Sequence, residues 1–232
     1  MAAIGDHNNL SVIAPHKKKY IDRYDIDWLI SEVKHGTLLR YATFWQAGAG
    51  NKNRRLSQWY QGNPITVNGR QYVTAEQYMM SEKALLFNDT QSYLKIMAEP
   101  DPKMCKHLGK LVAGFNQAVW DSALREIIFH GNLAKLQSDI SIVEALLETG
   151  NAVLVEASPL DDIYGAGLGR NDLLNPDGSL KAPPWEWHKH GETRQATNHL
   201  GFILMGLRDL FCEMLGYRFT PEMEEKVWIW GK

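Results

Sequence analysis

The sequence has few cysteines and no long apolar run. Only Cys105 and Cys212 occur in 232 residues, and they form no C-x-x-C pair, so we expect two reduced thiols rather than a disulfide framework. No apolar stretch approaches the ~20 residues of a membrane-spanning helix, and the N-terminus has no secretory signal pattern. We therefore expect a cytoplasmic protein without a membrane partner.

The sequence also lacks a large excess of charge of one sign and any metal-ligand motif. The formal net charge is −2, which gives no global signal for nucleic acid but leaves room for a local basic groove. His188 and His190 have no Cys, Asp or Glu partner at ligand spacing, so we interpret them as surface histidines. We expect neither a metal ion nor another cofactor.

What the chain does have is the length and the apolar content of one domain. Hydrophobic residues make up 44% of it, and no low-complexity linker interrupts it. We predict a flexible arm at 1–25, a domain at 26–216 and a tail at 217–232. Within the domain, the Pro-rich and Gly-rich segment 169–197 is interpreted as a surface excursion.

Apolar periodicity and capping residues predict a mainly helical chain with a few strands. We expect helices over about 27–35, 75–87, 90–98, 101–108, 140–148 and 198–215, and a long one that begins at Asn116. Strands are expected at 40–45 and 152–159, and a hairpin at 65–73 around an Asn-Gly turn.

The helix predicted over 75–87 carries two charges on its apolar side. Glu76 and Lys83 fall among apolar residues, where an unpaired charge is costly. Seven residues span roughly 10 Å of helix rise, so direct pairing of the two is awkward. We interpret both as parts of a ligand site; the alternative is that each makes a buried pair with another side chain.

The same helix has a predicted polar edge. Thr74 and Gln77 form an S/T-x-x-Q capping pattern at its start. At about 100° per residue, Gln77, Ser81 and Asn88 lie together on the side opposite Glu76, and we expect them to face water.

Further carboxylates follow a mostly apolar strand. Glu156 ends the strand predicted at 152–159, and Asp161, Tyr164 and Gly165 follow in a loop, where functional groups are common. Two carboxylates around one bond are the usual arrangement for glycoside cleavage, because the transition state resembles an oxocarbenium ion. For Glu156 alone, capping of the loop is an equal alternative.

Lys83 adds a covalent route to the same chemistry. An N-glycosidic carbon is at the aldehyde oxidation level, so an amine can attack the opened sugar as a Schiff base. Apolar surroundings would lower the pKa of Lys83 and favour its neutral form.

Several other side chains are candidate ligand contacts. Trp59, Trp120 and Tyr164 either stack on a ring of the ligand or pack in the core. Asn198 either caps its helix or binds a sugar hydroxyl. Arg54 lies in the basic, glycine-rich segment 48–55, which either holds a phosphate or is a solvated loop.

A set of short motifs occurs in a fixed order along the chain: Leu56-Ser57-Gln58-Trp59-Tyr60, Thr74-Ala75-Glu76-Gln77-Tyr78, Lys83, Lys106-His107-Leu108-Gly109-Lys110, Trp120, Leu154-Val155-Glu156-Ala157-Ser158-Pro159, Asp161, Tyr164-Gly165-Ala166-Gly167 and Asn198-His199-Leu200-Gly201. In this order the motifs resemble the NADAR (YbiA-like) superfamily over residues 40–212. Three features depart from the family pattern: Tyr164 stands in place of a tryptophan, Ala196 in place of a glycine, and 169–197 is longer.

The resemblance implies a compact, mainly helical α+β domain with a small β-sheet and hairpin, and a metal-independent N-glycosidase. It places Glu76 and Lys83 on the catalytic helix, and it places Trp120, Glu156, Asp161 and Asn198 around the pocket. Family members are associated with ribosylamino-pyrimidine phosphates of riboflavin biosynthesis and with ADP-ribose on guanine bases of nucleic acid.

We therefore predict hydrolysis of the N-glycosidic bond between a ribose phosphate or ADP-ribose and a nitrogenous ring. The substrate is either a nucleotide-like small molecule or ADP-ribosylated guanine in nucleic acid. One alternative is a non-catalytic ADP-ribose or nucleotide reader that retains the pocket. Another is a structural interaction protein that docks through 169–197.

Overall fold

Helices form most of the structure, a computed structural model that describes residues 17–46 and 53–219. The helices are α2 (Lys17–Ile21), α3 (Ile26–Lys34), α4 (Ala75–Leu86), α5 (Thr90–Met97), α6 (Pro102–Lys110), α7 (Gln117–Ser138), α8 (Ile140–Leu147), α9 (Arg170–Leu173) and α10 (His199–Leu215). Two short 3-10 helices are η2 (Arg54–Leu56) and η3 (Pro184–Glu186). Among the described residues, no helix has the length and apolarity needed to cross a bilayer.

Two small sheets complete the described part of the fold. Strands β1 (Tyr41–Phe44) and β4 (Val153–Glu156) pair in parallel, with Phe44 opposite Glu156, and β2 (Ile65–Val67) pairs antiparallel with β3 (Arg70–Tyr72). The hairpin turns through Asn68 and Gly69 at positive φ, as the Asn-Gly sequence predicts. The predicted mainly helical α+β fold is confirmed.

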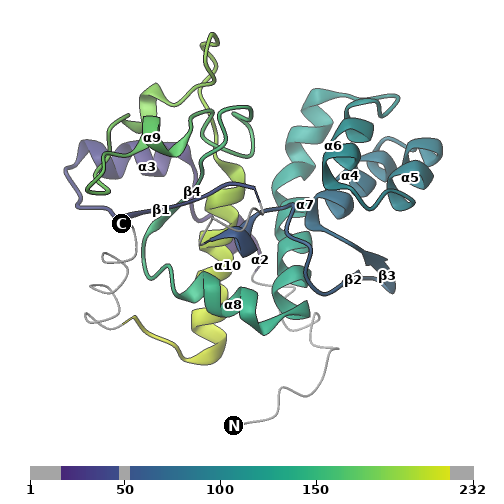
Figure 1. The fold of residues 1–232 in the computed structure, drawn as a ribbon, viewed down its shortest axis with the longest axis horizontal. Coiled ribbons are helices and arrows are strands. Elements are labelled where there is room, and N and C mark those ends of the chain that lie inside the picture. Colours follow the sequence, from purple (N-terminus) through teal and green to yellow (C-terminus); the bar gives the residue numbers. More distant parts are fainter. Residues whose placement is uncertain (1–16, 47–52, 220–232) are drawn as a thin grey trace.

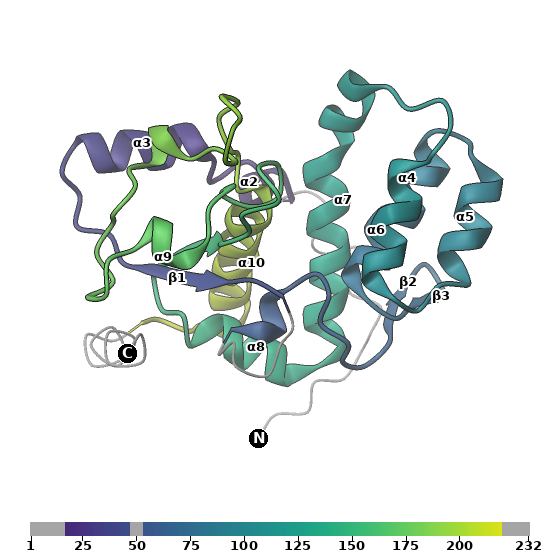
Figure 2. The ribbon, with the colours of Figure 1, turned by 45° about the horizontal axis from the view of Figure 1, so that its top comes forward.

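The elements form two groups that meet at α7 and α10. Helices α4, α5 and α6 pack together with the β2–β3 hairpin on one side of α7, whereas α10 packs on β4, α2 and α8 on the other side (Figures 1 and 2). The carboxyl ends of β1 and β4 point toward the junction of the two groups, where the chain turns into loops.

Side-chain caps explain where the helices begin. Thr74, Asp89, Asp101, Asn116 and Asp139 each accept a hydrogen bond from a backbone amide in the first turn of the helix that follows. These residues satisfy amides that the helix itself leaves unpaired. The helices predicted at these positions are confirmed to within about two residues.

Helix α10 is central because its backbone lies directly against its neighbours. A Cβ added at Gly201 would meet the carbonyl oxygen of Leu154 at 2.1 Å, and one at Gly206 would meet the carbonyl oxygen of Tyr20 at 2.1 Å. All residues from Leu200 to Arg208 are buried. The absence of a side chain at these two positions therefore allows α10 to pack closely against β4 and α2.

Gly201→Ala is expected to lower the free energy of unfolding by about 1–3 kcal/mol or more, because the methyl group overlaps backbone that cannot rotate away. Urea denaturation measures this change. Gly169→Ala is the matched control, since Gly169 has φ −75° and its added Cβ would have only an ordinary contact at 3.5 Å. Equal stability of the two variants would contradict the close approach of α10 to β4.

The predicted arm at 1–25 is wrong over its described part. Residues 17–25 form α2 and the turn that leads to α3, and α2 packs on α10. The hydroxyl of Tyr20 donates to Glu213 at 2.6 Å and that of Tyr24 donates to Asp209 at 2.8 Å. Two aromatic rings with partners on α10 thus fix this segment. Residues 1–16, and 220–232 of the predicted tail, lie outside the described residues.

Segment 169–197 is more than a surface excursion, contrary to the prediction. Trp187 is only 1% exposed, and its indole N–H donates to the carbonyl of Ala182 at 2.9 Å. The guanidinium of Arg194 forms two hydrogen bonds with the carboxylate of Asp162, at 2.5 and 3.1 Å. The buried indole anchors the segment to the body of the domain. The predicted exposure of the histidines at 188 and 190 is confirmed.

The predicted polar edge of α4 does not face water. The side-chain amide of Gln77 donates to three carbonyls that follow one another around the end of α5, at 2.9 to 3.3 Å. Its oxygen accepts from the amide of Val73 at 2.7 Å, and Ser81 donates to the carbonyl of Tyr78. Gln77 thus caps the C-terminal end of α5, and these hydrogen bonds explain why the Gln77 side chain is buried. Asn88, the third residue of the predicted edge, is exposed as predicted.

Candidate active site

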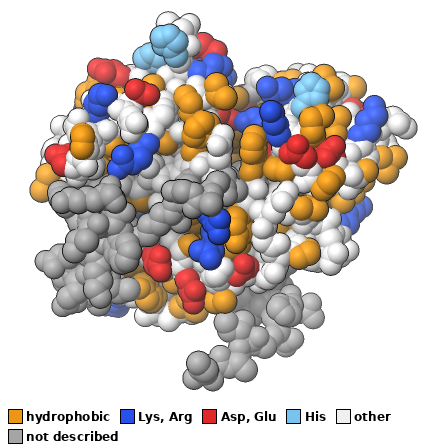
Figure 3. Space-filling view, in the orientation of Figure 1, with side chains coloured by type: hydrophobic (Ala, Val, Ile, Leu, Met, Phe, Trp, Pro, Cys, Tyr) orange, Lys and Arg blue, Asp and Glu red, His pale blue; other side chains and the backbone are white. Residues whose placement is uncertain are grey.

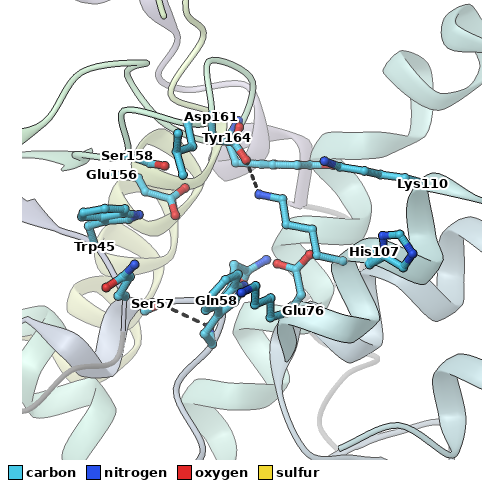
Figure 4. Close-up of a pocket in the computed structure, with 15 residues that line it drawn as sticks. Trp45, Ser57, Gln58, Glu76, His107, Lys110, Glu156, Ser158, Asp161 and Tyr164 are labelled. Carbon is cyan, nitrogen blue, oxygen red and sulfur yellow. Dashed lines mark hydrogen bonds and ion pairs between the residues drawn. The ribbon is translucent and has the colours of Figure 1, made fainter. Parts of the chain in front are cut away.

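A cavity of about 340 Å³ lies at the junction of the two groups of elements. Its wall comes from the segment after β1, the turn after η2, the first turn of α4, one face of α6 and the loop after β4 (Figure 4). Because these segments are distant in sequence, only the folded chain forms the cavity. It brings together three carboxyl groups, two indoles and several basic side chains.

Two of the carboxyl groups have little contact with solvent: Glu76 is buried and Glu156 is half-buried. Glu76 comes from the first turn of α4, and Glu156 is the last residue of β4. Burial raises the pKa of Glu76 to about 7, with Lys106 opposing the shift, and burial together with Asp161 raises the pKa of Glu156 to about 8. Oε1 of Glu76 and Oε2 of Glu156 have no hydrogen-bond partner among the described residues. Two poorly solvated acids therefore line the cavity with free oxygens.

The third carboxyl group is held in place by its own loop and by a lysine. Oδ1 of Asp161 accepts from the amides of Ile163 and Tyr164, at 3.1 and 2.8 Å. Oδ2 accepts from Nζ of Lys106 at 2.6 Å (Figure 4). Burial lowers the pKa of Lys106, but the three carboxyl groups outweigh burial and raise it. Lys106 is therefore an ammonium ion at neutral pH, within reach of the cavity.

Lys83 is not part of the cavity wall, so the prediction that Glu76 and Lys83 point into the same cavity is wrong. Its Nζ lies over the ring of Phe115 at 4.2 Å and over that of Trp120 at 5.4 Å. Burial lowers the pKa of Lys83. The two residues share a side of α4, but the cavity is at the first turn and Lys83 is in the last turn. The amine that faces the cavity belongs to Lys106 on α6.

The other predicted contacts divide into two sets. Trp59, Asp161 and Tyr164 line the cavity together with the two glutamates. Trp120 is buried and does not line it, and neither does Arg54 in η2. Residues 48–52 of the predicted phosphate loop lie outside the described residues.

Asn198 and Gly165 support the cavity from behind. The side chain of Asn198 accepts from the amide of Glu156 at 3.0 Å and donates to the carbonyl of Leu154 at 2.9 Å. It occupies the N-cap position of α10 without a side-chain capping bond, so the capping role predicted for its side chain is wrong, and it does not line the cavity. A Cβ at Gly165 would meet the carbonyl oxygen of Glu156 at 2.7 Å. Both residues hold the loop after β4 close to the strand and thereby position Glu156.

Sequence reasoning gave no role to the basic face of α6. Lys103, Lys106, His107 and Lys110 all line the cavity, and their i, i+3, i+4, i+7 spacing places them on one side of the helix. This spacing was a signal available in the sequence. Trp45 was also missed; it follows β1, whose parallel pairing with β4 brings it to the same edge as Glu156.

Within the described residues, no group of three His, Cys, Asp or Glu side chains is arranged to hold a metal ion. Cys105 and Cys212 are free thiols, as predicted. Burial raises the pKa of Cys105 to about 12.

Comparisons with known proteins agree with this architecture. N-glycosidase R617 of Acanthamoeba polyphaga mimivirus is 38% identical over 167 residues, which are 68% of this chain and 91% of the relative. Protein irg-1 of Caenorhabditis elegans is 31% identical over 103 residues, 44% of this chain and 49% of irg-1. N-glycosidase Npun_R5314 of Nostoc punctiforme is 26% identical over 151 residues, 65% of this chain and 81% of the relative.

A solved structure has the same fold. The NMR structure of the E. coli protein YbiA superposes with a TM-score of 0.56 and 22% sequence identity, over 78% of this chain and 91% of that one. The family model described as the NADAR domain matches residues 43–211, which include every cavity residue named above. This chain therefore belongs to the NADAR family.

Proposed function

We propose that this protein is an N-glycosidase that hydrolyses the bond between a ribose phosphate or ADP-ribose and a nitrogenous ring. The observation that carries the proposal is the meeting of Glu76, Glu156 and Asp161 in one cavity, two of them with raised pKa values and free oxygens. Acids with such pKa values can exchange protons near neutral pH. Two relatives that carry the name N-glycosidase support the reaction class.

Glu156 is the proposed general acid. With a pKa of about 8 it carries a proton at neutral pH, and its Oε2 has no partner among the described residues. As the bond from the anomeric carbon to the leaving nitrogen breaks, its electron pair passes to that nitrogen, which takes the proton of Glu156. The leaving ring thus departs in neutral form.

Glu76 is the proposed general base. Its pKa of about 7 leaves a substantial carboxylate fraction at neutral pH. In that form it accepts a proton from a water molecule whose oxygen bonds to the anomeric carbon. The products are the free sugar phosphate and the neutral nitrogenous ring, and the two glutamates return to their starting states by proton exchange with solvent.

Lys106 and Asp161 form the proposed electrostatic frame of the reaction. The carboxylate of Asp161 is held by two amides and by the ammonium of Lys106, so its position is set before the substrate binds. A preorganised charge of this kind stabilises a developing oxocarbenium ion without reorganisation. The indoles of Trp45 and Trp59, which line the same cavity, are placed to contact the ring of the substrate.

The direct test is incubation of the purified protein with ADP-ribosyl-guanosine and, separately, with a ribosylamino-pyrimidine phosphate. We expect release of guanosine from the first substrate or of the aminopyrimidine from the second, detected by mass spectrometry, and loss of that release in Glu156→Gln. A non-catalytic nucleotide reader would instead bind without forming product over hours. Absence of product from both substrates, with binding retained, would favour the reader.

A further inference from the structure

The face of α6 that borders the cavity is strongly basic. Lys103, Lys106, His107 and Lys110 contribute to the cavity wall from this one helix. In the close-up, His107 and Lys110 lie on the side of the cavity across from Trp45 (Figure 4). In the space-filling view, lysine or arginine and histidine side chains gather around α6 beside the junction of the two groups (Figure 3).

Three of these four side chains have no partner among the described residues. Lys106 is paired with Asp161, but Lys103, His107 and Lys110 make no hydrogen bond or ion pair with any described residue. All three side chains are exposed, and they differ from other exposed lysines without a partner, such as Lys95, in that they line the cavity.

Acidic side chains close to α6 in the sequence are engaged elsewhere. The carboxylate of Asp101 accepts from the amide of Lys103, and that of Glu99 accepts from the amide of Asp101, so both cap the start of α6. Glu76 and Glu156 are less exposed than the basic side chains: Glu76 is buried and Glu156 is half-buried. The cavity thus has an acidic floor and a basic rim.

We infer that this basic rim, made by Lys103, His107 and Lys110, binds the phosphate groups of the substrate. Charge-assisted hydrogen bonds from ammonium groups to phosphate oxygens would give these side chains the partners they lack. Lys103 and Lys110 are seven residues apart, roughly 10 Å along the helix, which is long enough for two phosphoryl groups. The inference rests on the proposed function, because it assumes that the sugar carbon reaches the acidic floor while the phosphate stays at the rim.

Of the basic segment 48–55 first considered for phosphate, residues 48–52 lie outside the described residues. Arg54, a described member of that segment, is in η2 and does not line the cavity. By contrast, all three rim side chains border the same cavity as the carboxyl groups. Phosphate binding at the rim therefore places the ligand next to the proposed acid and base.

Titration calorimetry of the full chain with ribose 5-phosphate, ADP-ribose and unphosphorylated ribose tests the rim. We expect the double variant Lys103→Gln/Lys110→Gln to bind both phosphorylated ligands at least about tenfold more weakly, because each loses two charged donors. Its affinity for ribose should stay within about twofold. A larger loss for ADP-ribose than for ribose 5-phosphate would identify a diphosphate as the preferred ligand, and the reverse would identify a monoester.

Lys95→Gln is the matched control, since Lys95 is an exposed lysine of the neighbouring helix α5 and does not line the cavity. It should leave all affinities unchanged. Equal phosphate affinity in the wild type and the double variant would overturn the inference.

Kinetics separate the failure of this inference from the failure of the proposed function. If the rim only holds phosphate, the double variant raises KM at least about tenfold while kcat changes little, because binding without transition-state contact is lost. Hydrolysis with an unchanged KM in the double variant would contradict phosphate binding at the rim but support the N-glycosidase activity. Loss of phosphate affinity in a protein that hydrolyses neither substrate would support phosphate binding at the rim and contradict the N-glycosidase activity.

Discussion

Glu156→Gln is expected to lower kcat by about 10²- to 10⁴-fold, because it removes the proposed proton donor while keeping the size of the side chain. The wild-type rate should rise with pH through about 7, as Glu76 ionises, and should fall with pH above about 8, as Glu156 loses its proton. The two carboxyl groups interact, so the apparent pKa values of the pH–rate profile belong to the pair and not to single residues. The residual rate of Glu156→Gln should no longer fall at alkaline pH, and that of Glu76→Gln should no longer fall at acid pH.

Stability measurements distinguish a catalytic loss from an unfolded variant. The pKa of Glu156 is higher in the folded state than in the unfolded state, so the folded protein holds the extra proton and loses stability as pH rises from about 4.5 to about 8. Glu156→Gln removes this penalty and should be at least as stable as the wild type at pH 9. Glu144→Gln, an exposed change on α8, is the control. An inactive variant that also melts earlier at pH 9 would contradict the assignment.

Lys106→Met is expected to reduce kcat/KM by at least about a hundredfold, whereas Lys83→Met should cost less than about tenfold. The physical reason is position: Lys106 lies 2.6 Å from Asp161 in the cavity wall, and Lys83 lies over two aromatic rings outside it. Steady-state kinetics with the preferred substrate measure both changes. A reversed order of the two effects would restore Lys83 as the catalytic amine.

Lys106→Met also leaves the carboxylate of Asp161 without its partner, which can destabilise the fold. The double variant Lys106→Met/Asp161→Asn removes both charges and controls for this effect. If the double variant is as stable as the wild type and still inactive, the loss is one of chemistry. Recovery of most activity in the double variant would assign the pair a structural role only.

Local signals in the sequence predicted most of the secondary structure. The caps at Thr74, Asp101 and Asn116, and the Asn-Gly turn at 68–69, depend on hydrogen bonds or on backbone angles within a few residues. Because such interactions do not need distant partners, their positions follow from short stretches of sequence. The same locality explains why Glu76 could be placed in the first turn of α4 and Glu156 at the end of a strand.

Other features depended on neighbours that are far away in the sequence. Gln77 appeared to face water, but α5 covers it and uses its amide as a cap. Asn198 appeared to be a cap or a ligand contact, but it bonds to the edge of β4. In each case the side-chain amide can form hydrogen bonds with water, backbone or a ligand. The packing of distant elements decides which of these groups lies next to it.

The sequence by itself determined the family, the mainly helical fold and the acids at positions 76, 156 and 161 as site candidates, because motif order and local hydrogen bonds are properties of the chain. Only the tertiary structure decided that these acids share one cavity and that Lys106 rather than Lys83 joins them. It also placed the basic face of α6 at the cavity rim. Helix periodicity defines the side on which a residue lies, whereas the packing of α4, α6 and β4 defines which of those sides meet.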